Sequence, residues 1–345
     1  MDSSASELLD HWIIPLFDLC ERMRHEARKA LLAARRSGDF SHVAAAVSEG
    51  AGDTSYGLDV ASEKALREWS QEVARVQPLS ILSEATGWRH LAPSQGGVRE
   101  LEGFDHGGPR IVVDPVDGTR NLMTDLRSAW SVVGMAGPGK STPRQSELVF
   151  GMLSEIPDTR AASYRRLSAV RGGPCHFEER AFYKGGPIVK PVELRSGSDA
   201  RVDHGYFPFF KYMADMRPQI AAIEARFLER LERLEGAQVR SCWDDQYISN
   251  GGQLALLALG SYRMLADLRA HLAERRGKPT LSTKPYDIAG ALLCAQAAGC
   301  VVTAVDGSEL DFPLDVKTPV SWVGWVNEET RARLAPHLSA ALAAS

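Results

Sequence analysis

The chain has 345 residues, of which 44% are hydrophobic and 24% are charged, with 40 Lys and Arg against 44 Asp and Glu. At about 150 residues per domain, this length predicts two packed domains. The composition excludes a disordered, collagen-like or coiled-coil protein. A net charge of −4 and the lack of a long basic run in the sequence argue against a nucleic-acid partner.

The N-terminal sequence, the most apolar stretch and the cysteines indicate the cellular location of the protein. The N-terminal sequence MDSSASELLDHW has acids where a signal peptide needs positive charge, and the most apolar later stretch, 291–305, is interrupted by Gln296 and Gly299. We therefore expect a cytoplasmic protein with no membrane partner. The five cysteines have no CxxC spacing, which predicts reduced thiols and neither a disulfide framework nor a zinc site.

The first half of the chain predicts two helices followed by strands. Apolar residues recur at helical spacing over 8–23 and again over 60–73. Short β-like runs follow at 79–82, 111–113, 130–135, 148–153 and 161–170. This half is expected to be α+β.

The second half favours alternating helices and strands. Helical patterns cover 218–234, 253–259 and 288–298, and a strand is expected at 300–304. The polar stretch RSGSDARVD at 195–203 is the predicted boundary. It divides an N-terminal α+β domain, residues 1–195, from a C-terminal α/β domain, residues 196–345.

The most informative segment is RIVVDPVDGTRNL at 110–122, where an apolar strand leads into Asp114, Pro115, Asp117 and Gly118. Proline fixes φ and glycine allows unusual backbone angles, so the turn can bring both carboxylates to one side. An ordinary turn is the alternative interpretation, because Asp-Pro and Asp-Gly are common turn dipeptides.

Thr119 opens a short predicted helical stretch at 120–126. The backbone N–H groups of Gly118 and Thr119 at its start would form an anion site beside the two carboxylates. Carboxylate oxygens without nearby Cys or His suit Mg²⁺ better than zinc. The segment therefore predicts a site for a phosphate ester on Mg²⁺.

These residues resemble the inositol monophosphatase superfamily, whose members are Mg²⁺-dependent, typically Li⁺-inhibited phosphatases that include fructose-1,6-bisphosphatases and nucleotide 3′-phosphatases. The resemblance rests on DPVDGT at 114–119, Tyr-Gly-Leu-Asp at 56–59, Ser-Glu at 83–84, Gly-Gly-Gln-Leu at 251–254 and Pro-Tyr-Asp at 285–287. It implies an α/β fold, the layered αβαβα sandwich of the inositol monophosphatase and fructose-1,6-bisphosphatase type.

The resemblance also implies roles for single residues. Two or three Mg²⁺ ions would be held by the carboxylates of Glu84, Asp114, Asp117 and Asp287 and by the backbone carbonyl of Val116. Thr119 would orient the attacking water, Asp59 would accept a hydrogen bond from the Thr119 hydroxyl, and Glu84 would also count among the catalytic groups. Gly118 and Thr119 would bind phosphate. Asp59 and Asp287 each precede a predicted helix, so N-capping is an alternative role for both.

Converging acids would need a cation. Two unit charges 4 Å apart repel by about 4 kcal/mol at an effective dielectric constant near 20, and a divalent ion removes this conflict. Magnesium would also supply the charge stabilisation that phosphate ester hydrolysis requires.

The sequence departs from the family pattern at several positions. Ala85 stands where the family usually has a second acid after Glu84, and Gln253 replaces a lysine typical of nucleotide phosphatases. Asp267 and Arg269 are candidates for contacting sugar hydroxyls, with solvated helix-end charges as the alternative. The Gly-rich stretch between Glu84 and Asp114 is expected to form a lid over the site, so that deletion of 96–107 should alter KM.

Taken together, we expect a Mg²⁺-dependent, Li⁺-sensitive phosphomonoesterase for a small cyclitol, polyol or sugar phosphate, working as a homodimer. The alternatives are fructose-1,6-bisphosphatase, histidinol-phosphatase or nucleotide 3′-phosphatase specificity, a non-catalytic Mg²⁺- and phosphosugar-binding regulatory protein, and a purely structural subunit.

Overall fold

A computed structural model describes residues 3–49, 54–182 and 186–344. Its main feature is a nine-stranded sheet made of β3 (Leu79–Ser83), β4 (Gly87–Ser94), β5 (Gly97–Glu100), β6 (Arg110–Asp117), β7 (Ala129–Ala136), β8 (Leu148–Ile156), β9 (Ser163–Val170), β10 (Cys175–Ala181) and β11 (Pro187–Leu194). The strand order is β11-β10-β9-β8-β7-β6-β3-β4-β5. Neighbouring strands are antiparallel except β3 and β6, which are parallel.

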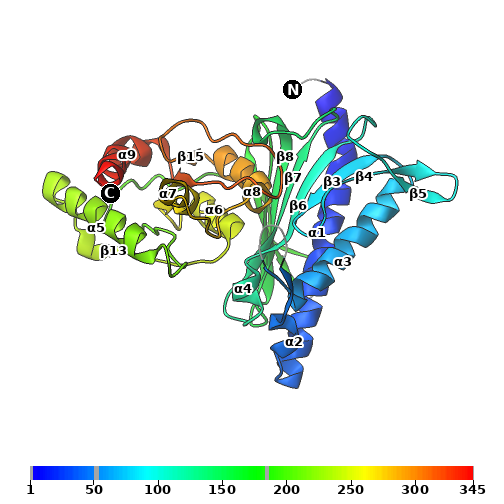
Figure 1. The fold of residues 1–345 in the computed structure, drawn as a ribbon, viewed down its shortest axis with the longest axis horizontal. Coiled ribbons are helices and arrows are strands. Elements are labelled where there is room, and N and C mark those ends of the chain that lie inside the picture. Colours follow the sequence, from blue (N-terminus) through cyan, green and yellow to red (C-terminus); the bar gives the residue numbers. More distant parts are fainter. Residues whose placement is uncertain (1–2, 50–53, 183–185, 345) are drawn as a thin grey trace.

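Two long helices, α1 (Ser3–Ser37) and α3 (Gly57–Ala74), cover one face of this sheet. Their apolar stripes, which include Trp12, Leu16 and Trp69, share a buried cluster with Ile111 of β6 and Met135 of β7. Both helices follow from apolar residues at helical spacing, as the sequence predicts. They lie beside each other on the right of the sheet in Figure 1.

The opposite face is covered by α6 (Asn250–Ala258) and α8 (Pro285–Ala297). Leu254 and Ile288 share a buried cluster with Val132 of β7. A Cβ atom at Gly290 would lie 1.9 Å from the carbonyl oxygen of Val133, so only glycine permits α8 to lie this close to β7. The close contact fixes the position of the first turn of α8 relative to β6 and β7.

A smaller antiparallel sheet lies beyond these helices, with β14 (Met264–Asp267), β16 (Trp322–Trp325) and β15 (Val301–Thr303) in that order. Its outer face packs on α5 (Arg217–Glu235) and α9 (Glu328–Ala343), where Phe227, Met264 and Leu334 share a cluster. On its inner face, Trp322 packs with Leu257 of α6. The layers are therefore αβαβα, as predicted, and Figure 1 shows them from right to left.

The remaining elements are short. They are α2 (Ser41–Ala44), α4 (Thr119–Leu122), α7 (Arg269–Arg276), the pair β1 (Ala46–Glu49) and β2 (Thr54–Tyr56), the pair β12 (Gly205–Tyr206) and β13 (Cys242–Trp243), and 3₁₀ turns at Gln145–Glu147 and Val239–Ser241. The predicted helical stretch 120–126 is limited to α4, and Asp125 adopts φ 53°.

Most of the predicted helices and strands are present, but their first and last residues differ from the predicted ones. The five strands predicted in the first half correspond to β3, β6, β7, β8 and β9, and the strand predicted at 300–304 corresponds to β15. In the large sheet, β4, β5, β10 and β11 were not predicted. Asp59 and Asp287 lie inside the first turns of α3 and α8, so the prediction that they precede these helices is wrong. In each case the carboxylate accepts a backbone N–H from the residue before the helix, which is a capping-box arrangement.

Three other expectations concern the whole chain. All five cysteines are free thiols. Within the described residues, no helix combines the length and the apolar character needed to cross a membrane. The division at 195–203 falls between the two sheets, but α6 and α8 pack on both of them, and the two-domain division stays a prediction.

Candidate functional site

A bulge in β6 brings Asp114 and Asp117 to the same side of the sheet. Residues three apart in a regular strand point to opposite faces. Here Asp114 pairs with Val132 and Asp117 with Trp130, so one extra residue is inserted in β6 between the two pairs. The backbone N–H of Val116 donates to Asp114 Oδ1 at 3.0 Å, which holds the bulge. The ordinary turn interpretation of this segment therefore does not describe the structure.

The N-terminus of α6 holds Asp117. Its carboxylate accepts hydrogen bonds from Ser249 Oγ at 2.7 Å, from the N–H of Gly251 at 2.6 Å and from the N–H of Asn250 at 3.2 Å. A Cβ at Gly251 would lie 2.6 Å from Val132 Cγ2, so a side chain there would push α6 away from Asp117. Glycine at this position permits the contact.

Asp287 comes from the other half of the chain and reaches the same place. Its Oδ2 accepts the N–H of Lys284 at 2.8 Å and Asn250 Nδ2 at 3.2 Å. One carboxylate oxygen from each of Asp114, Asp117 and Asp287 lies within 4.8 Å of the other two. Asn250 contacts two of these three acids, so it connects the α6 and α8 sides of the cluster.

The electrostatics of the cluster are unfavourable without a cation. Burial, together with the charges of Asp117, Asp287 and Glu84, raises the pKa of Asp114 well above its usual range. Burial and the charge of Asp117 do the same to the pKa of Asp287. Burial raises the pKa of Asp117 to about 6, although its hydrogen bonds oppose this. A bound divalent cation would remove the repulsion that raises these values.

Glu84 lies at the end of β3 and lines the same cavity as the three aspartates. Its charge raises the pKa of both Asp114 and Asp287, so it lies close enough to act on them. All four acids offer only oxygen, and the donor set therefore fits a hard ion such as Mg²⁺. Neighbouring Ala85 is exposed and offers no side-chain ligand.

Thr119 and Asp59 form a pair next to the acids. Gly118 has φ 102°, a conformation that favours glycine, and the chain turns there into α4. The Thr119 hydroxyl lies 2.6 Å from Asp59 Oδ1 and 2.8 Å from the carbonyl oxygen of Val116. Because the hydroxyl has one proton, donation to Asp59 leaves an oxygen lone pair that can accept a hydrogen bond from water.

Arg269, Tyr212 and Phe210 form another part of the cleft wall. Arg269 is buried, pairs with the fully buried Asp267 at 2.6 Å and stacks over Phe210 at 4.4 Å. Asp267 also lies 2.6 Å from Thr283 Oγ1. Asp267 is therefore engaged inside the protein, and only Arg269 of the two predicted hydroxyl-binding candidates lines the cleft. The alternative interpretation, in which both are solvated helix-end charges, does not hold, because both side chains are buried.

The predicted lid is also wrong. Residues 87–100 form the β4 and β5 hairpin at the far edge of the large sheet, labelled on the right of Figure 1. None of the described residues that line the cleft comes from 96–107.

Several residues at the site were not predicted from the sequence, among them Ser249, Asn250, Tyr212 and Lys284. Ser249 is the N-cap of α6 and accepts the N–H of Gly252, so the Ser-x-x-Gly entry to an apolar helix was an available signal. Nothing in the local sequence around Tyr212 indicates a position beside Arg269.

The comparison with known proteins decides the family. The model described as "Inositol monophosphatase family" matches residues 21–342. The chain belongs to the inositol monophosphatase family. This membership supports phosphatase activity in the broad sense, and the family is generally metal-dependent.

A relative by sequence and two solved structures are similar to this chain. A Methanothermobacter thermautotrophicus protein named fructose-1,6-bisphosphatase/inositol-1-monophosphatase is 26% identical over 260 residues, covering 75% of this chain and 74% of that protein. The Leishmania major fructose-1,6-bisphosphatase in holo form shares the fold with a TM-score of 0.65 and 14% identity, over 99% of this chain and 96% of that one. The IMPase of Thermotoga maritima has a TM-score of 0.59 at 15% identity, over 95% and 98% of the two chains.

Proposed function

We propose that the protein is a Mg²⁺-dependent phosphomonoesterase of the inositol monophosphatase type, acting on a cyclitol, polyol or sugar phosphate. The observation that carries the proposal is the convergence of Asp114 and Asp117 with Asp287, within 4.8 Å, beside the pair of Thr119 and Asp59. A buried group of like charges is costly unless it serves a ligand.

The residues that would hold the metal are Glu84, Asp114, Asp117 and Asp287, with the carbonyl of Val116, for two or three ions. Bound Mg²⁺ would neutralise the acids, lower the pKa of an attacking water and stabilise charge on the phosphoryl and leaving oxygens.

The chain itself would position the reactants. Thr119, with its proton donated to Asp59, would accept a hydrogen bond from the attacking water and fix its direction. The N–H groups of Gly118 and Thr119 would hold the phosphoryl oxygens at the start of α4. The water oxygen would form the new bond to phosphorus and lose a proton while the ester P–O bond breaks. The leaving alkoxide oxygen would take up a proton, so that the products are inorganic phosphate and the alcohol. No protein nucleophile is needed.

The proposal is tested by phosphate release from inositol 1-phosphate, fructose 1,6-bisphosphate, histidinol phosphate and 3′-phosphoadenosine 5′-phosphate, with Mg²⁺ and with EDTA. Mg²⁺-dependent release from a sugar-like or cyclitol ester is expected. Absence of release from every ester would contradict the proposal.

The second candidate is a regulatory protein that binds a phosphorylated sugar without hydrolysing it, and Ala85 favours it because one expected acid is missing. Calorimetry would distinguish the two. Tight Mg²⁺-dependent binding of the intact ester over hours, without phosphate release, would support the regulatory protein.

From the family resemblance we further propose inhibition by Li⁺ and assembly as a homodimer. Inhibition is measured in the same phosphate assay, and light scattering after gel filtration gives the mass in solution for comparison with the 37.7 kDa chain.

A further inference from the structure

The catalytic cleft is too small for a whole substrate. Its free volume is about 70 Å³, and its lining is almost entirely polar. Small-molecule sites usually have volumes of about 300–1,000 Å³. The cleft has room for a phosphoryl group and its water, and a large leaving group would extend beyond it.

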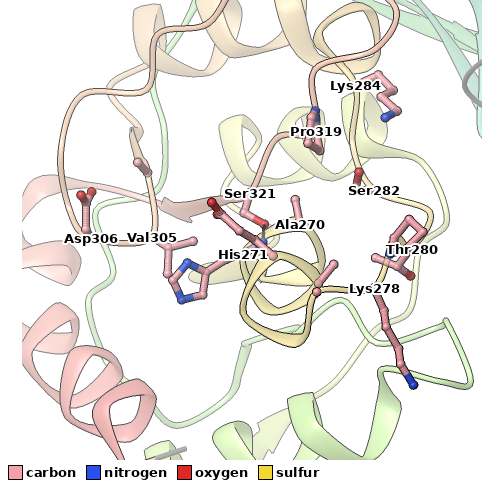
Figure 2. Close-up of a pocket in the computed structure, with 15 residues that line it drawn as sticks. Ala270, His271, Lys278, Thr280, Ser282, Lys284, Val305, Asp306, Pro319 and Ser321 are labelled. Atoms are coloured by element: carbon pink, nitrogen blue, oxygen red, sulfur yellow. Dashed lines mark hydrogen bonds between the residues drawn. The ribbon is translucent and has the colours of Figure 1, made fainter.

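A second cavity, which we call the side cavity, has a volume of about 730 Å³ and adjoins this cleft. Figure 2 shows Lys284, Ser282, Thr280 and Lys278 following one another along one side and Val305 with Asp306 on the other. Ala270 and His271 of α7 lie between the two sides. Ser282 and Lys284 line both the cleft and the side cavity, so the two spaces share a rim.

The segment 278–284 lies between the two spaces. Near its end, Thr283 forms a β-bridge with Val320, and Lys284 has φ −110° and ψ 159°. Leu281 lines the cleft, whereas Lys278, Pro279 and Thr280 line only the side cavity.

On the catalytic side, Thr283 Oγ1 lies 2.8 Å from Asn250 Oδ1. The segment ends at the first turn of α8, which holds Asp287. A group that extends past Ser282 and Lys284 would pass from the catalytic cleft into the side cavity.

The lining of the side cavity favours an uncharged polyhydroxyl group. Two lysines, Lys278 and Lys284, are balanced by two acids, Glu274 and Asp306. A second phosphate would meet both acids, at a cost in repulsion. Hydroxyl groups of Thr280, Ser282 and Ser321 offer donors and acceptors, and small apolar side chains such as Ala270 and Val305 lie between them. This mixture suits the hydroxyls and C–H faces of a sugar.

We propose that the side cavity binds the distal half of the leaving group, and that the substrates are monophosphates of disaccharide-sized, uncharged polyhydroxyl compounds. The inference rests on the proposed phosphatase function and narrows its substrate class. It differs from a bisphosphatase assignment, since the charge balance of the side cavity disfavours a second phosphate.

The experiment compares two esters with Mg²⁺ present: trehalose 6-phosphate, with a disaccharide leaving group, and glycerol 2-phosphate, whose leaving group is small. Wild-type kcat/KM is expected to be about tenfold or more higher for trehalose 6-phosphate. Ala270→Phe would fill the side cavity. It should lower kcat/KM for trehalose 6-phosphate by about tenfold or more and change that for glycerol 2-phosphate by less than about twofold.

Two further variants control the comparison. Ala222→Phe introduces the same side chain at an exposed position of α5 and should affect neither ester. Val305→Trp fills the side cavity from the opposite wall and should reproduce Ala270→Phe, which keeps the test valid if one variant does not fold. Thermal melts confirm folding of each variant.

The outcomes separate the two proposals. Hydrolysis of glycerol 2-phosphate without hydrolysis of trehalose 6-phosphate would overturn the side-cavity proposal while leaving the phosphatase function intact. Equal losses on both esters in Ala270→Phe and Val305→Trp would also overturn it. Hydrolysis of neither ester by the wild type, together with a negative result for the four esters named above, would overturn both proposals.

Discussion

Among single residues, Asp117 has a pKa that is subject to two opposing effects. Burial raises its pKa, whereas three hydrogen bonds from the start of α6 favour its ionised form. The hydrogen bonds hold this carboxylate in position, but they do not offset the cost of burying its charge. A bound cation would offset that cost. The charge of this residue, more than its shape, is expected to matter for function.

Asp117→Asn keeps the shape and removes the charge. We expect kcat/KM for the best ester to fall by about 10³ or more, because a group that binds the metal is lost. The Tm in EDTA should stay equal or rise, since repulsion with Asp114 and Asp287 is relieved. A variant with near wild-type turnover, or one that is unfolded in EDTA, would contradict this account of Asp117.

Thr119 is predicted to act through its hydroxyl alone. Thr119→Val has nearly the same volume, and we expect kcat to fall by about 10² with little change in Mg²⁺ affinity, because water orientation is lost and the acids remain. Thr119→Ser retains the hydroxyl and serves as the control. Equal activity of the valine and serine variants would show that the contact with Asp59 is only structural.

At the scale of elements, the site depends on how closely α8 lies against the large sheet. Because the first turn of α8 carries Asp287 and its middle carries Gly290, packing and metal geometry are coupled through one helix.

Gly290→Ala tests this coupling. Its Cβ would lie 1.9 Å from the backbone oxygen of Val133, so helix or strand must move, and we expect a loss of about 3 kcal/mol in unfolding free energy with reduced Mg²⁺ affinity. Gly96→Ala is the matched control, because no atom lies within 4 Å of the added Cβ. Equal urea midpoints for both variants would show that the close contact is unimportant.

Sequence alone predicted the elements whose pattern is local. The helical stripe of α1 and the apolar runs of β6, β7 and β8 follow directly from residue spacing. By contrast, β11 was missed because it is an edge strand whose polar residues, such as Lys190, face solvent. Strand β10 was missed because it contains Glu178 and Glu179, and Glu178 is buried against Arg166 of the neighbouring β9. Such segments become strands because they pair with a neighbouring strand, and no local sequence pattern encodes that pairing.

The same distinction holds for the site. Asp114, Asp117 and Thr119 stand in one short motif, and Asp287 was named through the family resemblance. Ser249 and Asn250 were missed, because their role exists only after α6 has been placed against β6. The lid prediction was wrong because the segment's length and glycine content do not say which sheet edge it joins.

At the scale of the whole molecule, the acid cluster couples stability to pH and to metal. A carboxyl group whose pKa is higher in the folded protein favours folding while it is protonated. This contribution is complete below the unfolded value of about 4 and is lost as pH rises through the folded value. For Asp117 the folded value is about 6.

We therefore expect that, in EDTA, Asp117→Asn and the wild type differ little in Tm at about pH 4, and that the variant becomes the more stable of the two by pH 7. Adding Mg²⁺ at pH 7 should raise the wild-type Tm more than that of the variant. Scanning calorimetry at both pH values measures this. A difference that is independent of pH, or no stabilisation by Mg²⁺, would contradict the coupling.

The central claim is that acids from both halves of the chain share one metal site. The most direct test is anomalous diffraction from a crystal soaked in Mn²⁺, which scatters strongly and accepts the same oxygen ligands as Mg²⁺. We expect a peak that contacts oxygens of Asp114, Asp117 and Asp287 together, with Glu84 on that ion or on a second one beside it. Peaks confined to other parts of the surface, with these carboxylates left unligated at saturating Mn²⁺, would contradict it.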